Sequence, residues 1–259
     1  MGLTASDSTT AITLSSSVAI QNRDLVVLIF GGSNWGFGSV PPIPYVSSVT
    51  DGVNTYNRAL IENTQVPLTG TSQYTSHDVE VWYAFNCVAI SSPNITANVV
   101  SGANAMVSIG CIRCGGINVA APLDQANATL DNTVYGTAFS SPSGSTPVST
   151  GGLAASHELV IGAFVMDNHQ SATNATTEGS GFNTLFDGAT PASAFSGQSI
   201  DPMHAAYKIA ASAVAVTYAP SWSNVGYTGS GATDVSCPTS VIVTFKAAPS
   251  GNVMAQVLG

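Results

Sequence analysis

Apolar residues in this chain gather in short runs that are separated by glycine, proline, asparagine and serine. The longest uninterrupted run, Leu25–Phe30, follows Asp24 and precedes Gly31-Gly32. A run of this length, rich in β-branched residues and ended by glycine, is typical of a strand buried on both faces. Glu158–Val165 repeats the pattern 134 residues later, again with one acid at its start. The sequence therefore predicts at least two long central strands.

Further extended segments run along the chain, and helix signals are scarce. Asp51-Gly52 lies between two of these segments, which is a strong hairpin signal. Ile95–Val100 and Ala105–Ile112 have the spacing of an antiparallel meander. The other predicted strands are Val79–Phe85, Gly181–Phe186, His204–Ile209, Ala213–Tyr218 and Ser240–Phe245. This pattern predicts an all-β fold, a two-sheet antiparallel β-sandwich with little helix.

We expect one domain, residues 1–259, because a two-sheet sandwich needs strands from both halves of this chain. Ser140–Pro147 has the composition of a linker, which places a flexible surface connection near residues 140–156. The segment 247–259 is a possible C-terminal arm, and its apolar end, Gly251–Gly259, is either an edge strand or an arm that docks on a neighbour. The first 17 residues form either a strand or an arm.

Charge is sparse, because 44% of the residues are hydrophobic and only 7% are charged. Fourteen acids and five bases give a net charge of −9, and the bases are scattered, which argues against nucleic-acid binding. No apolar run approaches the roughly 20 residues of a membrane helix, and we expect no membrane contact. With so little charge to oppose association, a surface of small polar residues favours packing against copies of itself, and thus a homo-oligomer.

The N-terminal residues have neither the basic start nor the apolar run of a signal peptide. Together with the Met1 start, this favours a protein made in the host cytoplasm that assembles into a virus particle. The alternative is a mature extracellular form.

Motifs along nearly the whole chain resemble a family of bacterial and phage β-sandwich domains, related in architecture to legume-lectin and laminin-G jelly rolls. The segments that carry the resemblance are Asp24–Val27, Ser48–Tyr56, Val81–Ala84, Glu158–Ala163, Gly181-Phe182 and Val241–Phe245. Each is a packing or turn motif. The resemblance implies a jelly-roll sandwich with a role in adhesion, sugar binding or virion surface structure, and it brings no catalytic signature.

Two carboxylates, Asp78 and Glu80, lie two residues apart on a predicted strand and therefore on one face, which Trp82 shares. Their expected separation of roughly 7 Å falls in the range for inverting glycosidases. Jelly-roll glucanases have a similar Glu-x-Asp-x-Glu pattern, but here Ser76 stands at the first position, so the nucleophile is absent. We expect a solvated strand face, or a contact with a sugar or cation. A glycosidase would need an open cleft and a third carboxylate, for which Glu62 is a candidate.

The other candidate contacts are aromatic residues. Trp35 and Phe37 lie in a glycine-rich segment that we interpret as an exposed loop, and Trp222 is a further candidate for stacking on a sugar. Two pairs offer oxygen ligands for calcium: Asp51 with Asn54, and Asp167 with Asn168 next to His169. Each of the four histidines is expected at the surface or in a loop. No cofactor is expected, with calcium possible.

The four cysteines lack the paired spacing of a zinc site, although Cys111 and Cys114 form one Cys-x-x-Cys pair. Buried free thiols are the leading interpretation. Cys87 and Cys111, on predicted neighbouring strands, are candidates for a disulfide in oxidising surroundings.

These features favour a non-enzymatic structural protein of a phage or other virus particle, as a coat, decoration or projecting subunit. Its partners would be copies of itself and other particle proteins. The alternative is a carbohydrate-binding adhesin module that contacts a cell-surface glycan, and an extracellular glycosidase is a third hypothesis. A binding module would shift its melting temperature with a glycan, whereas a pure coat subunit would not.

Overall fold

The computed structural model describes residues 3–7, 10–67, 73–100, 105–130, 134–135, 143–168, 173–188, 203–225, 235–249 and 253–258. Within these ranges the chain is all-β and every strand pair is antiparallel, which confirms the all-β, antiparallel part of the prediction. The described strands form five sheets, so the prediction of two sheets was wrong. The described residues contain no helix that is long and apolar enough to span a membrane.

The first half of the chain builds one central sheet. Its strands are β1 (Leu3–Asp7), β3 (Leu25–Phe37), β5 (Asn57–Pro67), β6 (Gln73–Ala84) and β8 (Met106–Gly115), in the order β1-β8-β3-β6-β5. A sixth strand, β20 (Met254–Leu258), pairs with β8 and comes from the C-terminus.

The second half builds a matching central sheet. Its strands are β10 (Val134–Tyr135), β13 (Leu159–Asn168), β15 (Asn183–Gly188), β16 (Met203–Ile209) and β19 (Val235–Phe245), in the order β10-β19-β13-β16-β15. Strand β9 (Leu123–Leu130) also pairs with β19.

Smaller sheets lie outside the two central ones. One contains β2 (Ala11–Ser15), β7 (Asn94–Val100) and β4 (Tyr45–Thr50), in that order. The others contain β11 (Ser143–Ser145), β18 (Ser221–Val225) and β14 (Thr173–Thr177), and the pair β12 (Val148–Ser149) and β17 (Thr217–Tyr218). We call these three the outer sheets.

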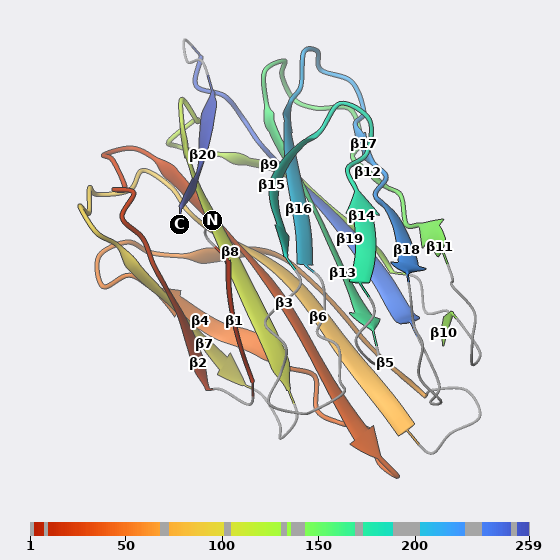
Figure 1. Cartoon of the computed structure of the whole chain (residues 1–259). Helices are drawn as coiled ribbons and strands as arrows, with labels where there is room; N and C mark the ends of the chain where they lie inside the picture. Colours follow the sequence, from red (N-terminus) through yellow and green to blue (C-terminus); the bar gives the residue numbers. More distant parts are fainter. Residues whose placement is uncertain are drawn as a thin grey trace.

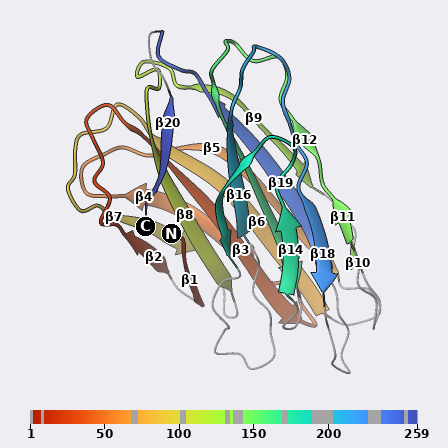
Figure 2. The same cartoon turned by 45° about the horizontal axis from the view of Figure 1, so that its top comes forward.

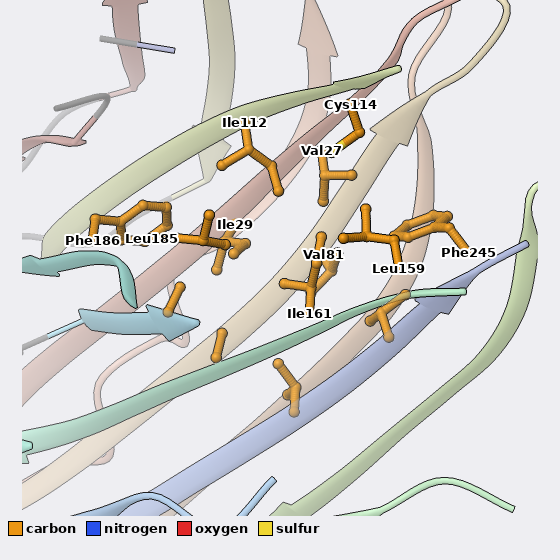
Figure 3. Close-up of a cluster of buried hydrophobic side chains, with 14 of the residues drawn as sticks. Val27, Ile29, Val81, Ile112, Cys114, Leu159, Ile161, Leu185, Phe186 and Phe245 are labelled. Atoms are coloured by element: carbon orange, nitrogen blue, oxygen red, sulfur yellow. The ribbon is translucent and has the colours of Figure 1, made fainter. Parts of the chain in front are cut away.

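The sheets stack in four layers (Figures 1 and 2). Between the central sheets, side chains from both halves of the chain form one core, in which Val27, Val81 and Ile112 face Leu159 and Ile161 (Figure 3). One further core lies on the outer side of each central sheet, between it and the outer sheet or sheets that cover it. This layering explains why Leu25–Phe30 is apolar at every position, because one set of alternate side chains enters the central core and the other enters an outer core.

The two halves of the chain repeat the same arrangement. The central orders β8-β3-β6-β5 and β19-β13-β16-β15 correspond strand for strand. A register shift falls at the same place in each, between Arg58 and Leu60 in β5 and between Thr184 and Phe186 in β15. The similar apolar runs recognised in the sequence are thus the equivalent strands β3 and β13.

The turns before β3 and β13 also match. Arg23 and His157 have positive φ angles of 70° and 64°. The acid that follows each of them accepts a hydrogen bond from the backbone three residues back: Asp24 Oδ2 from the Gln21 amide at 2.7 Å, and Glu158 Oε1 from the Ala155 amide at 2.9 Å. Burial, the main influence, raises the pKa of both acids.

Glycine at either turn position is expected to stabilise the protein. Side chains with a Cβ avoid the left-handed region, so Arg23→Gly and His157→Gly should each raise the free energy of unfolding by up to about 1 kcal/mol. Ser156→Gly is the control and should lower it slightly, because this exposed residue has no positive φ. Urea unfolding measures all three, and destabilisation by both turn variants would show that neither turn is strained.

Three local predictions were wrong, two of them because consecutive strands lie in different layers. Asp51-Gly52 does not close a hairpin: it carries the chain from β4 in an outer sheet to β5 in a central sheet. The strands β7 and β8 form no meander, since β7 lies in an outer sheet and β8 in a central one. Gly31-Gly32 does not end β3, which continues to Phe37.

The described residues near each end of the sequence include strands. The first 17 residues contain β1 and β2, and the C-terminal segment supplies the edge strand β20. Within residues 140–156, the described part contains β11 and β12. The single-domain expectation stays a prediction, and the central core uses side chains from both halves.

Candidate functional site

Asp78, Glu80 and Trp82 alternate along β6 and share the face that is covered by β4. Both carboxylic residues are fully buried. The predicted common face is therefore present, but the prediction that it is solvated was wrong. The alternation of the sequence gives the face of a strand, and an added outer sheet then covers that face.

Glu80 is held by three donors. Its Oε1 accepts from the Val46 amide at 2.6 Å, and its Oε2 accepts from Trp82 Nε1 at 2.8 Å and from Arg58 Nη1 at 3.2 Å. The Arg58 guanidinium also lies over the Trp82 ring, 5.4 Å from its centroid. These donors stabilise an ionised carboxylate and fix β4, β5 and β6 to one another.

Asp78 has the opposite environment. Burial, followed by the charge of Glu80, raises the pKa of Asp78 well above its usual range, and the Arg58 charge only partly offsets this. Glu62 on β5 adds a smaller effect in the same direction. The two carboxyls on this face therefore differ in their surroundings: Glu80 accepts from three donors, whereas burial and the charge of Glu80 oppose ionisation of Asp78. A glycosidase needs carboxyls that substrate can reach, and this buried pair does not meet that condition.

Among the aromatic candidates, the structure describes the side chains of Trp82 and Trp222 but not those of Trp35 and Phe37. Trp82 and Trp222 are buried, with 8% and 2% of their surface exposed, so neither offers an open face to a sugar ring. Trp222 covers Gly144 of the neighbouring strand β11, where a side chain would collide with its ring. Trp35 and Phe37 lie in β3, not in a loop, and pair with Thr75 and Gln73 of β6. Their side chains lie outside the described atoms.

Asp51 and Asn54 organise the crossing between β4 and β5. Asp51 accepts hydrogen bonds from the Val53 and Asn54 amides at 2.9 and 2.7 Å. It also accepts from Asn54 Nδ2 at 2.8 Å and from the Tyr56 hydroxyl at 3.1 Å. Asn54 Oδ1 accepts from the Val88 amide at 2.8 Å. These hydrogen bonds give both residues a structural role in holding the turn.

The second calcium candidate lies at the end of a strand. Asp167 and Asn168 are the last residues of β13 and pair with Ser236 and Val235 of β19. The described atoms do not include their side chains, and His169 falls outside the described residues. Among the residues that the structure describes, no three acidic, histidine or cysteine side chains gather as a metal site.

The three cysteines whose side chains the structure describes lie in cores. Cys87, Cys111 and Cys114 are buried free thiols, and no disulfide joins Cys87 to Cys111. Burial raises the pKa of Cys87 to about 12 and the pKa of Cys111 well above its usual range. The side chain of Cys237 lies outside the described atoms. Thiols with raised pKa values are poor nucleophiles at neutral pH, which fits a packing role.

Two of the histidines contradict the surface expectation. His77 is 2% exposed and His204 is fully buried. His204 and Glu80 occupy equivalent places in the two central sheets, since they pair with Phe164 of β13 and Phe30 of β3. His204 Nε2 lies 3.9 Å from a carboxylate oxygen of Glu178. His157 is exposed as predicted.

The outer sheets were not predicted from the sequence. Among the strands that the structure describes, those of the outer sheets contain no Asp, Glu, Lys or Arg. Their hydroxyl and amide groups bond across strands, as in Thr13 with Thr96 at 2.8 Å and Ser149 with Thr217 at 2.7 Å. The signal was present as period-two alternation without charge, for example in Ala11–Ser15.

Comparison of the chain with protein-family models, with curated proteins and with solved structures finds no match.

Proposed function

We propose that this protein is a structural subunit of a virus particle or a similar surface assembly, which packs against copies of itself and other particle proteins. On this proposal each half of the chain is a jelly roll, an eight-stranded fold common in capsid and lectin domains. The order β1-β8-β3-β6 beside β2-β7-β4 supports that assignment, with β5 added to the central sheet.

The lack of charge on the outer sheets is the observation that carries the proposal. A charged side chain loses hydration when another surface covers it, whereas hydroxyl and amide groups can exchange water for partners on the facing surface. In the outer sheet β2-β7-β4, one set of side chains is buried and the outward set carries no charge, as the burial patterns of β2 and β7 illustrate. Surfaces of this kind lie on both sides of the molecule, so one copy has two faces on which to pack.

Adding one positive charge to each outer face is expected to weaken self-association at least tenfold. Thr13 and Thr217 are exposed residues in outer strands, and the double variant Thr13→Lys/Thr217→Lys places an ammonium group in each interface. Sedimentation velocity across a range of concentrations measures the change.

The matched control adds the same two charges elsewhere. Ser91 and Ser212 are exposed residues in connections outside the strands, so Ser91→Lys/Ser212→Lys should associate like the unmodified protein. Equal weakening by both pairs would mean that net charge, not the outer faces, controls association.

A further inference from the structure

The two halves of the chain exchange their last strands. After β8 the chain crosses to the second half, where β9 pairs with Thr239–Phe245 of β19. After β19 it crosses back, and β20 pairs with Cys111–Gly115 of β8. Each exchanged strand fills the same position at the edge of the other half's central sheet, as Figure 1 shows for β20 beside β8.

The two crossing segments meet between the halves. Ile117 forms an isolated antiparallel bridge with Ala247, and the Ala248 amide donates to the Gly116 carbonyl at 2.8 Å. The Asn118 amide donates to the Lys246 carbonyl at 2.9 Å. The arrangement is that of a strand-exchanged dimer whose two copies are joined into one chain.

One difference separates the two exchanged strands. The chain continues after β9 into the second half, which keeps this strand within its own molecule. β20 is joined to β19 through residues 246–253. The edge of β8 that receives it would be identical in a second copy.

The connection to β20 is longer than its present position requires. Ala248 bonds to Gly116, and Met254 lies opposite Gly115, which is the neighbouring residue. A chain of this length between Ala248 and Met254 spans up to roughly 20 Å when extended. The number of residues between Ala248 and Met254 therefore does not by itself restrict β20 to the β8 of its own chain.

We propose that, in the assembled protein, β20 pairs with β8 of a second copy and so links neighbouring subunits. The donated strand forms the same hydrogen bonds as in the closed molecule, since the same register along Cys111–Gly115 is available in every copy. The open edge that a departing β20 leaves is filled by the strand of a neighbour, which avoids an exposed unpaired edge. This inference rests on the proposed function, because it names the link between assembled copies.

The native thiol of Cys114 can be used to test whether the β20 paired with β8 belongs to the same chain or to a second copy. Ala255 lies directly opposite Cys114 in the pairing of β20 with β8. The Cα atoms of such a pair lie about 4.5–5.5 Å apart, within the range for a disulfide. Ala255→Cys in the full chain, assembled and then mildly oxidised, is expected to give covalently linked dimers and longer species in non-reducing gel electrophoresis.

Matched variants make the outcome specific. Gln256→Cys lies opposite Arg113, which offers no thiol, and should give little crosslinking. Leu258→Cys lies opposite Cys111 and provides a second position if the first variant folds poorly. Disulfides that form only within single chains of an assembled sample would overturn strand donation and leave the proposed function standing. A protein that stays monomeric at every concentration would overturn both.

Discussion

Glu80→Gln is expected to lower the free energy of unfolding by about 2–3 kcal/mol. This loss is smaller than the usual cost of breaking a fully buried ion pair, because Arg58, the partner of Glu80, is partly exposed. The side chain of Arg58 is 40% exposed, whereas that of Glu80 is fully buried. Glutamine has one acceptor oxygen in place of two, so the Val46 amide and the Trp82 indole cannot both keep their partner. Urea unfolding at neutral pH measures the loss.

Glu62→Gln is the control for this effect. It removes a carboxylate from the neighbouring strand β5, at a residue that is only partly buried. Its expected cost is within about 0.5 kcal/mol, as for most surface substitutions. If Glu62→Gln costs as much as Glu80→Gln, the three donors around Glu80 do not hold the strands together.

Asp78→Asn is expected to stabilise the protein at pH 8 by about 1–3 kcal/mol, the range for relieving an unfavourable buried polar group. The pKa of Asp78 is raised in the folded protein by burial and by Glu80, relative to about 3.9 in the unfolded chain. The unfolded chain therefore releases this proton more readily. The contribution of Asp78 to stability is complete below pH 3.9 and is lost as pH rises through the folded pKa.

Asparagine removes this proton equilibrium and keeps the shape of the side chain. The variant should therefore match the unmodified protein near pH 4 and exceed it increasingly toward pH 8, in thermal unfolding measured across this range. The charged residues near Asp78 are Glu80, Arg58 and Glu62, so Glu62→Gln is again the comparison and should retain most of the pH slope. An unchanged slope in Asp78→Asn would mean that Asp78 is already ionised in the folded protein.

Periodicity predicted the strands that are buried on both faces, and it did so for a physical reason. In β3 and β13, cores on both sides require apolar residues at nearly every position, so Leu25–Phe30 and Glu158–Val165 stand out from the chain. The sequence did not predict correctly which strands share a sheet. Asp51-Gly52 has the residues of a hairpin turn but connects two layers, because local turn chemistry does not specify which strands pair across the sequence.

At the candidate site, too, the local strand pattern was predicted correctly and the contacts between distant strands were not. Alternation placed Asp78, Glu80 and Trp82 correctly on one face, since the side-chain period of a strand is local. Their burial depends on β4, which is brought over them by pairing with β7. The sequence left Ala11–Ser15 open as part of a strand or an arm, although its residues alternate with period two. The charge-free outer face of β2 gains meaning only beside the other outer strands.

Light scattering on the unmodified protein, across concentrations, tests self-assembly most directly. The proposal predicts a stable species whose mass is a multiple of the 26.2 kDa chain. A monomer that persists at every concentration would contradict it.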